Sequence, residues 1–349
     1  MIVKNEAECI EACLESVKGA DEIVIVDTGS EDNTVELCKK YTDKVYTDYK
    51  WNDDFSEARN ESLKRCTADW ILIIDADEVL EVPILGIRHI LNNYMTKEVE
   101  GHVIRYFGML FSVQTGKELV ASIRIIKNTP AIKWDGAIHN SLTYDGSNAR
   151  LRAMCYQSKF LIKSGYSVAH FKDPDRTFRI LNKQLEATPD NTRLMYYMGR
   201  ECIAKSTHTE NKDRLMEFID LAIYWLEKYE SIEFYRDWLD ELSDAEFCLA
   251  NLYLEKYGLL KDDAYWYQSV LAALKSFAVL PSNQNTADVL SGLMMVIPGG
   301  RNYPGAAHYW QKVADNCHNE GVSQIRERMR PDINAMLRMN QKARELIQK

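Results

Sequence analysis

The 349-residue chain contains no uninterrupted apolar run that approaches the roughly 18–20 residues needed to cross a membrane. Its start lacks the charged, apolar and small-residue pattern of a signal peptide. Its eight cysteines are scattered without any C-x-x-C pair, which argues against a metal or redox motif of that kind. These absences predict a cytoplasmic protein with reduced thiols and no membrane partner.

Positive charge is also in short supply. The chain has 43 Lys and Arg against 52 Asp and Glu, which gives a formal net charge of −9. This balance argues against a non-specific binder of polyanions, so nucleic acid is not the default partner. Hydrophobic residues make up 46% of the chain and charged residues 27%, as in globular proteins. At this length we expect two or three domains.

The texture of the sequence changes twice along the chain. The first hundred residues alternate strand and helix patterns, which predicts a parallel sheet with crossover helices. From about residue 100 to 170, short strand-like runs divided by Gly, Asn and Asp indicate an antiparallel addition to that sheet. From about residue 174 onward the apolar spacing predicts helical hairpins, arranged as two or three degenerate repeats of roughly 34–40 residues.

Carboxylates follow two of the expected strands. One apolar strand leads into Asp75-Ala76-Asp77, and an earlier one leads into Asp27. Because open α/β sheets bind ligands at the carboxyl ends of their strands, we expect these acids at one edge. Two carboxylates spaced i, i+2 can converge on Mg²⁺ or Mn²⁺ together with phosphate oxygens. Asp27 is expected to bind the base or ribose of a nucleotide, and a solvated turn with capping Asp is the alternative for the pair.

Four stretches in a fixed order carry a family resemblance: Ile2–Glu6, Asp21–Ser30, Trp51–Asn60 and Trp70–Glu78. Together they resemble the GT-A domain of family-two glycosyltransferases. The most similar group joins this domain to tetratricopeptide-like helices and includes the sublancin-type peptide S-glycosyltransferases. The resemblance implies an α/β, Rossmann-like GT-A domain with a mostly parallel sheet at residues 1–172, followed by an all-α helical-hairpin domain at residues 173–349.

The resemblance also implies roles for the residues that match the family's motifs. Asp77 would hold Mn²⁺ or Mg²⁺, Asp75 would bind the same metal or the ribose, and His170 would be a further metal ligand. Later segments that resemble family blocks begin at Arg124 and Trp134. The full set implied to bind the nucleotide-sugar donor is Asn5, Glu6, Asp27, Arg59, Asp75, Ala76, Asp77, Arg124 and Trp134.

One departure from the family pattern concerns the catalytic base. The family has glutamate after the histidine of its isoleucine-histidine-glutamate block, whereas this chain has Asn140, whose amide cannot take a proton. Asp135 or His139 would then serve as the base, or the acceptor is acidic enough to need little help. His139 and His170 can equally be ordinary hydrogen-bonded core histidines.

These observations predict a metal-dependent, inverting glycosyltransferase that moves a sugar from a nucleotide diphosphate, with a UDP-sugar expected, to a peptide, glycan or other acceptor. A sugar-nucleotide pyrophosphorylase is disfavoured because no Gly-rich triphosphate loop follows the first strand. Two alternatives stay open: a non-catalytic scaffold of TPR-like helices with a relic GT-A domain, and a glycosyltransferase that acts on modified DNA bases. Most aromatic residues of the helical part are expected in its core, and the other aromatic residues in a groove for an extended partner or in a homo-oligomer contact.

Overall fold

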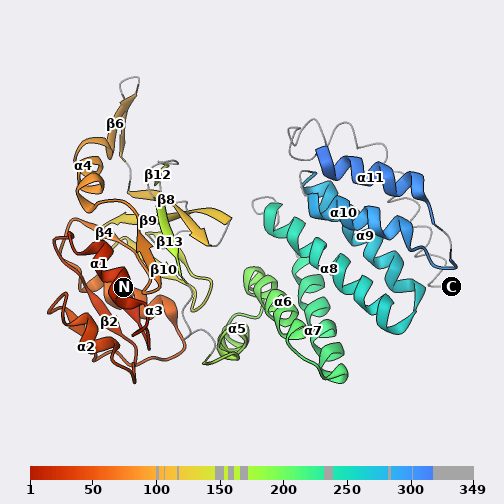
Figure 1. Ribbon diagram of the computed structural model, residues 1–349, viewed down its shortest axis with the longest axis horizontal. Coiled ribbons are helices and arrows are strands. Elements are labelled where there is room, and N and C mark those ends of the chain that lie inside the picture. Colours follow the sequence, from red (N-terminus) through yellow and green to blue (C-terminus); the bar gives the residue numbers. More distant parts are fainter. Residues whose placement is uncertain are drawn as a thin grey trace. The chain divides into compact units, whose positions relative to one another are not determined.

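The chain forms two compact units, Met1–Ile180 and Leu181–Lys349 (Figure 1). The front unit contains the sheets, and the second unit contains helices. The structure is a computed structural model, and it describes residues 1–99, 102–105, 107–115, 118–145, 153–155, 161–165, 172–231, 239–281, 284–300 and 302–316.

Three parallel strands open the front unit. β1 (Ile2–Val3) pairs with β2 (Ile25–Asp27), and β2 pairs with β3 (Val45–Tyr46). Helices α1 (Ile10–Val17) and α2 (Thr34–Cys38) connect these strands. The buried residues of α1 recur at i, i+3, i+4 and i+7, which is one face of a helix, and they are Ile10, Cys13, Leu14 and Val17. The alternation of strand and helix predicted for this region is confirmed.

A second sheet of six strands is mixed. β8 (Gly108–Thr115) and β9 (Glu118–Lys127) form a long antiparallel pair at its centre, so the antiparallel strands expected after residue 100 are present. They lie in this second sheet and, contrary to expectation, are not added to the three-stranded parallel sheet. Parallel pairing continues in this sheet where β13 and β12 lie beside β8. The path order is β4 (Trp70–Leu72), β9 (Glu118–Lys127), β8 (Gly108–Thr115), β13 (Leu161–Ser164) and β5 (Glu78–Leu80), with β12 (Ala153–Cys155) off the path.

The remaining elements of the front unit frame these sheets. Helix α4 (Ile84–Tyr94), which the sequence reading did not predict, packs Ile87 and Ile90 into a core with Phe111 of β8 and Ile125 of β9. Burying each such side chain contributes roughly 1.5–3 kcal/mol before entropy is counted. The other elements are α3 (Phe55–Lys64), the hairpin β6 (Thr96–Val99) with β7 (His102–Arg105), and the hairpin β10 (Ile132–Asp135) with β11 (Ser141–Tyr144).

Helix α5 (Arg176–Ala187) begins in the front unit, and its first turn is held there by charge. The Arg179 guanidinium contacts both carboxylate oxygens of Asp53, at 2.9 and 3.0 Å, and also pairs with Asp173 at 3.0 Å. Arg176 lies over the ring of Phe55, 5.2 Å from its centroid. Asp53 has a φ of 65°, a left-handed conformation that Asp tolerates better than most residues.

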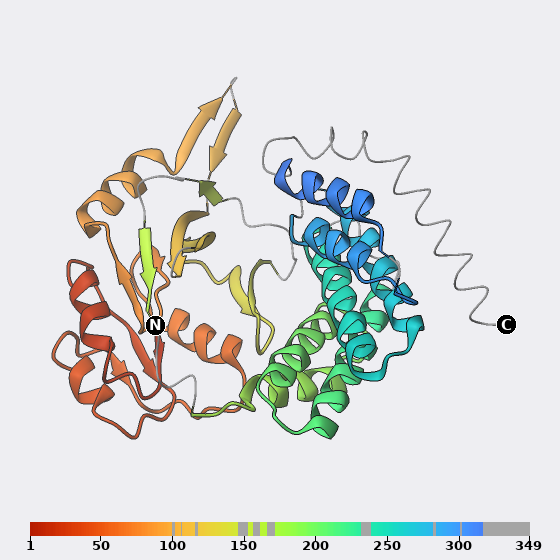
Figure 2. The same cartoon turned by 45° about the vertical axis from the view of Figure 1, so that its right-hand side comes forward.

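Antiparallel helix pairs build the second unit, green to blue in Figures 1 and 2. Side-chain caps begin several of the helices: the side-chain Oδ1 of Asn191 accepts from the N–H of Leu194, and the carboxylate of Asp262 accepts from the N–H of Ala264. The predicted helical hairpins are confirmed. The helices are α6 (Thr192–Thr207), α7 (Lys212–Glu230), α8 (Leu239–Leu260), α9 (Asp263–Val279), α10 (Gln284–Met295) and α11 (Pro304–Asn316).

The pairs do not match the predicted repeat length. In the described residues the three pairs begin at Thr192, Leu239 and Gln284, a spacing longer than the roughly 34–40 residues expected. Within the first pair, Gly199 allows α6 and α7 to approach closely. A Cβ at that position would come within 2.6 Å of Leu226. The predicted fold class, an α/β domain followed by all-α helices, is confirmed.

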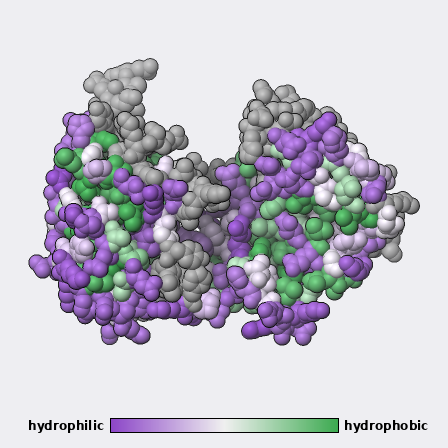
Figure 3. Space-filling model, in the orientation of Figure 1, coloured by the Kyte–Doolittle hydropathy of each residue, from purple (hydrophilic) through white to green (hydrophobic). Residues whose placement is uncertain are grey.

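Large hydrophobic side chains are exposed at several places in the helical unit, and Figure 3 shows hydrophobic residues interrupting its hydrophilic surface. Tyr224 of α7 is one, and Leu259 and Leu260 at the end of α8 are others. None of the helices in the part of the chain that the structure describes has the length and hydropathy to cross a membrane. Six cysteines in the described residues form no disulfide, and they are Cys9, Cys13, Cys38, Cys66, Cys202 and Cys248.

Candidate active site

The predicted acidic motif forms a tight turn between β4 and β5. The N–H of Glu78 donates to the carbonyl of Asp75 at 3.1 Å, which closes the turn. Burial alternates along it: Ala76 is buried, and the carboxylates of Asp75 and Asp77 are half-exposed. Because Ala76 packs into the apolar cluster behind the three-stranded sheet, only its backbone is available to a ligand. The two acids are therefore presented together at the end of β4.

Hydrogen bonds join the loop that follows β1 to the loop that follows β2. Asn5 has a φ of 58°, its N–H donates to Ser30 Oγ at 2.9 Å, and its Oδ1 accepts from the N–H of Glu31 at 2.7 Å. Asp27 is only 5% exposed, and its carboxylate accepts from the N–H groups of Gly29 and Ser30. Gly29 adopts a φ of 108°, which favours glycine. Asp27 thus holds the loop that follows β2 in place. The prediction that Asp27 also binds a nucleotide stays a prediction.

Glu6 lies at the start of α1 in an electronegative environment. Its N–H donates to Thr34 Oγ1 at 2.8 Å, and its carboxylate accepts from the thiol of Cys9 at 3.2 Å. Burial, and then the hydrogen bond to Glu6, raise the pKa of Cys9 to about 12, and the charge of Asp77 adds to this effect. Cys9 is therefore a protonated thiol rather than a nucleophile.

Arg59 of α3 links the acidic turn to the β10–β11 hairpin. Its Nη2 lies 3.4 Å from Asp75 Oδ1, and its Nη1 donates to Asn140 Oδ1 at 2.9 Å. The guanidinium also lies over the rings of Trp134, at 5.1 Å, and Phe55, at 5.8 Å. Its side chain is 22% exposed. Asn140, which stands where the family has glutamate, therefore helps to hold this arginine.

The β10–β11 hairpin is fastened to α3 along its length. Asn60 makes two hydrogen bonds with the backbone of Trp134, at 2.9 and 2.8 Å, and the N–H of Phe55 donates to the carbonyl of Ala137 at 2.8 Å. The two predicted bases, Asp135 and His139, are exposed on this hairpin. His139 has a φ of 47°. The structure thus brings both predicted bases onto the hairpin that Arg59 contacts through Asn140.

Arg124 of β9 pairs with a residue that the sequence reading did not single out. Its two terminal nitrogens bind the Glu78 carboxylate at 2.9 and 2.6 Å, and the side chains are 12% and 4% exposed. Burial, and then the charge of Asp75, raise the pKa of Glu78 to about 7, although Arg124 opposes this shift. One feature of the sequence could have revealed Glu78. It is an acidic residue at the start of a buried strand, and a buried carboxylate needs a partner.

The candidate ligands for a divalent cation at this turn are the half-exposed carboxylates of Asp75 and Asp77. The predicted additional ligand, His170, lies outside the described residues. Within the described ranges, no group of three or more His, Cys, Asp and Glu comes together in a way that could hold a metal. Mg²⁺ and Mn²⁺ sites commonly use one or two carboxylates and complete the set with substrate phosphates and water. The donor set fits a cation of that kind.

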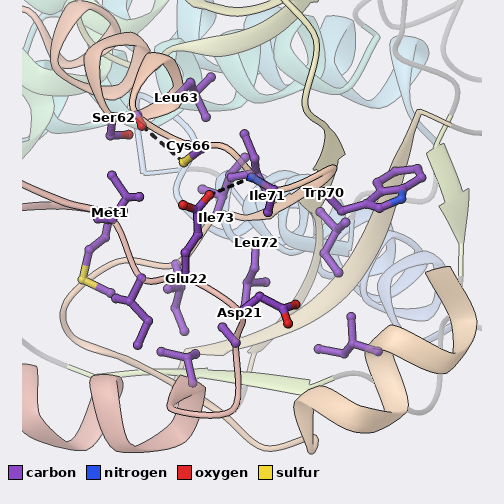
Figure 4. Close-up of a pocket in the computed structure, with 18 of the residues that line it drawn as sticks. Met1, Asp21, Glu22, Ser62, Leu63, Cys66, Trp70, Ile71, Leu72 and Ile73 are labelled. Carbon is purple, nitrogen blue, oxygen red and sulfur yellow. Dashed lines mark hydrogen bonds between the residues drawn. The ribbon is translucent and has the colours of Figure 1, made fainter. Parts of the chain in front are cut away.

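A cavity of about 550 Å³ extends from the candidate site between β4 and the three-stranded sheet. In Figure 4, Met1 lies on one side of it and Trp70 on the other. Arg59, Asp75 and Trp134 are among its lining residues, and the rest of its wall is mostly aliphatic. In the described sheets β4 pairs only with β9, so its other edge carries no strand.

Comparison with known proteins agrees with the resemblance seen in the sequence. Residues 1–84 match the family described as Glycosyl transferase family 2. A TPR repeat-containing protein of Synechococcus elongatus is 49% identical over 82 residues, which cover 23% of this chain and 20% of that protein. The match lies in the part of the chain that carries the predicted resemblance to family-two glycosyltransferases.

A longer match relates the chain to a named enzyme. The SPbeta prophage-derived glycosyltransferase SunS of Bacillus subtilis is 28% identical over 263 residues, which cover 69% of this chain and 56% of SunS. The matched part of the chain thus spans about a fifth of the Synechococcus protein and about half of SunS. Among solved structures, S. aureus TarS 1-349 in complex with UDP aligns over 95% of this chain and 91% of TarS, with 13% identity and a TM-score of 0.33.

Proposed function

We propose that this chain is a metal-dependent, inverting glycosyltransferase that transfers a sugar from a UDP-sugar to a peptide, glycan or other acceptor. One observation carries the proposal: Asp75 and Asp77 are presented half-exposed beside Arg59, in the domain that matches the glycosyltransferase family. The relationship to a protein named as a glycosyltransferase over 69% of the chain supports it.

The donor would bind across the ends of β1, β2 and β4. We assign the nucleotide to Asn5, Glu6 and Asp27, and the diphosphate to the turn Asp75–Asp77. Mn²⁺ or Mg²⁺ held by Asp75 and Asp77, with His170 as the predicted further ligand, would supply electrostatic stabilisation to the departing diphosphate. Arg59 adds a fixed positive charge beside Asp75, in a partly buried place where such a charge acts strongly.

The acceptor side of the site would be the β10–β11 hairpin. Asp135 or His139 is the candidate for removing the acceptor proton, because both are exposed on this hairpin. Asn140 cannot act as a base, but its Nδ2 is buried without a hydrogen-bond partner among the described residues. The amide can therefore donate a hydrogen bond to a bound molecule. Trp134 lies against Arg59 and would border the sugar.

The helical unit is the proposed site of acceptor recognition, and its exposed aromatic and aliphatic side chains are the surface available for this. The same surface could support a homo-oligomer. A scaffold with a relic front domain is the competing function, and a modified DNA base is the competing acceptor. The clustering of Asp75, Asp77 and Arg59 favours a working donor site over a relic.

A screen of nucleotide sugars with the full chain tests the proposal. We expect one UDP-sugar to be hydrolysed slowly to UDP when Mn²⁺ or Mg²⁺ is present, and not after chelation. Mass spectrometry of candidate peptides, glycans and DNA incubated with that donor would then identify the acceptor by the added hexose mass. The absence of hydrolysis and of transfer for every nucleotide sugar, with and without metal, would favour the scaffold.

A further inference from the structure

The backbone of the acidic turn is held from beneath by the buried pair of Glu78 and Arg124. Glu78 Oε2 accepts two hydrogen bonds, one from the N–H of Asp75 at 2.9 Å and one from Arg124 at 2.9 Å. The second oxygen, Oε1, accepts from the other terminal nitrogen of Arg124 at 2.6 Å. Because Glu78 is 4% exposed and its oxygens point inward, it cannot itself serve as a ligand to a bound molecule.

The turn is fastened at two more points that belong to different elements. The thiol of Cys13 in α1 donates to the carbonyl of Asp75 at 3.3 Å, and the N–H of Gly165, which follows β13, donates to the carbonyl of Asp77 at 2.6 Å. A Cβ on Gly165 would lie 2.4 Å from that carbonyl oxygen, a distance that side chains do not tolerate. The approach therefore requires glycine. The turn between Asp75 and Asp77 is fixed by contacts to α1, β9 and the end of β13.

Arg124 offsets part of the negative charge at this turn. Three carboxylates, those of Asp75, Asp77 and Glu78, lie within four consecutive residues and repel one another. Arg59 contacts Asp75 on the partly exposed side, and Arg124 contacts Glu78 on the buried side. A bidentate guanidinium fixes the direction of the carboxylate that it binds as well as offsetting its charge.

We propose that Glu78 and Arg124 are positioning residues, which hold the backbone of the Asp75–Asp77 turn in the shape that binds the diphosphate of the donor and its cation. The inference rests on the proposed function of that turn and assigns Arg124 to the support of the site rather than to direct nucleotide contact. It predicts that a loss of the pair is felt first in binding of nucleotide and metal, before the fold is lost.

The test measures Mn²⁺-dependent binding of UDP by calorimetry, and thermal unfolding, on the full chain. Glu78→Gln keeps the shape but removes the charge, and we expect it to weaken Mn²⁺-dependent UDP binding at least tenfold. Arg124→Met leaves Glu78 unpaired and should lower both affinity and melting temperature. In the double variant E78Q/R124M no buried charge is left unpaired, so the melting temperature should recover while the affinity does not.

A second variant reaches the same turn without altering a charge. Gly165→Ala should displace the Asp77 carbonyl and weaken Mn²⁺-dependent UDP binding about tenfold. Gly258→Ala in α8 is its matched control, because a Cβ there meets nothing within 4 Å. Glu246→Gln alters a buried carboxyl group that contacts Lys275 in the helical unit, and it is the control for Glu78→Gln.

Each result decides the proposal. Wild-type affinity in folded Glu78→Gln and Gly165→Ala proteins would overturn it, and so would a double variant that recovers affinity together with melting temperature. An equal loss of affinity in Glu246→Gln would show a general effect of stability and would also overturn it. If the wild-type chain binds no UDP with Mn²⁺, the proposed function itself fails, and the positioning role fails with it.

Discussion

The two units both bury charged side chains, but they use them for different ends. In the front unit, Glu78 and Arg124 lie beneath a turn whose neighbouring carboxylates are half-exposed. In the helical unit, Lys275 of α9 pairs with Glu230 of α7 and with Glu246 of α8, and so joins three helices. A buried ion pair alone therefore does not mark a functional site. Its position beneath accessible acids at strand ends is what indicates one.

The largest expected effect is a loss of donor hydrolysis on substitution of an accessible acid of the Asp75–Asp77 turn. Asp77→Asn should reduce metal-dependent donor hydrolysis by about 10²–10³-fold, because the amide keeps the shape but loses the charge that holds the cation. Thermal unfolding should change little, since Asp77 is half-exposed. Asp69→Asn is the matched control, because that side chain is 92% exposed and lies at the start of β4. Near-normal turnover of Asp77→Asn with saturating Mn²⁺ would refute the metal assignment.

The second prediction concerns truncated chains that lack the helical unit. A chain that ends at Ile180 should keep metal-dependent hydrolysis of the donor but lose transfer to the acceptor by at least tenfold, because acceptor recognition is assigned to the helices. A chain that ends at Lys172 also loses the contacts of Arg179 with Asp53 and of Arg176 with Phe55, and it should be less stable by about 1 kcal/mol. Circular dichroism establishes folding of both. Normal glycosylation of the full acceptor by the folded shorter chain would contradict acceptor recognition by the helices.

A smaller effect, on the front unit, appears at acid pH. Burial opposes the charge of Glu22, but hydrogen bonds from Lys44, Ala68 and Thr67 outweigh it and lower the pKa of this carboxyl to about 2. A lowered native pKa stabilises the fold above the unfolded value near 4.5, and this contribution disappears as the pH falls toward 2. Glu22→Gln should therefore cost about 1–2 kcal/mol at pH 7 and much less at pH 2, after allowance for solvent screening.

Urea unfolding at several pH values measures this contribution. Glu15→Gln is the control, since Glu15 forms only an exposed pair with Lys18. If the stability difference between wild type and Glu22→Gln is the same at pH 2.5 and pH 7, the hydrogen-bonded carboxylate is not its source.

The helical unit should respond to pH in the opposite direction. Burial raises the pKa of Glu246 to about 8, with Glu230 adding to the shift and Lys275 opposing it. A raised native pKa stabilises the fold fully below the unfolded value near 4.5, and the contribution fades as the pH rises through about 8. Unfolding followed by helical signal should therefore show stability that declines between pH 5 and 8, and Glu246→Gln should flatten the decline. A slope unchanged in this variant would rule out Glu246 as its cause.

Much of the front unit could be predicted because its strands and helices are local patterns. Alternating elements up to Trp70, the acidic turn and the antiparallel strands after residue 100 all follow from residues close together in sequence. Contacts across long separations could not be read in this way. Arg59 meets Asn140 across 81 residues, and Glu78 meets Arg124 across 46. No local pattern encodes either distance.

The family resemblance implies that Arg124 binds the donor, and this assignment stays a prediction. The structure adds that both terminal nitrogens of Arg124 bind Glu78. Two errors concern helices. Helix α4, at Ile84–Tyr94, was not predicted. The repeat length was taken too short because the helices of the second unit run up to 22 residues.

Calorimetric titration of the full chain with UDP, with and without Mn²⁺, tests the central claim most directly. The account predicts that UDP binds at least tenfold more tightly with Mn²⁺ than after chelation, and that Asp77→Asn abolishes this difference while Asp69→Asn preserves it. Absence of UDP binding in the presence of Mn²⁺, or binding of equal strength with and without the metal, would contradict the account of the Asp75–Asp77 turn as the donor site.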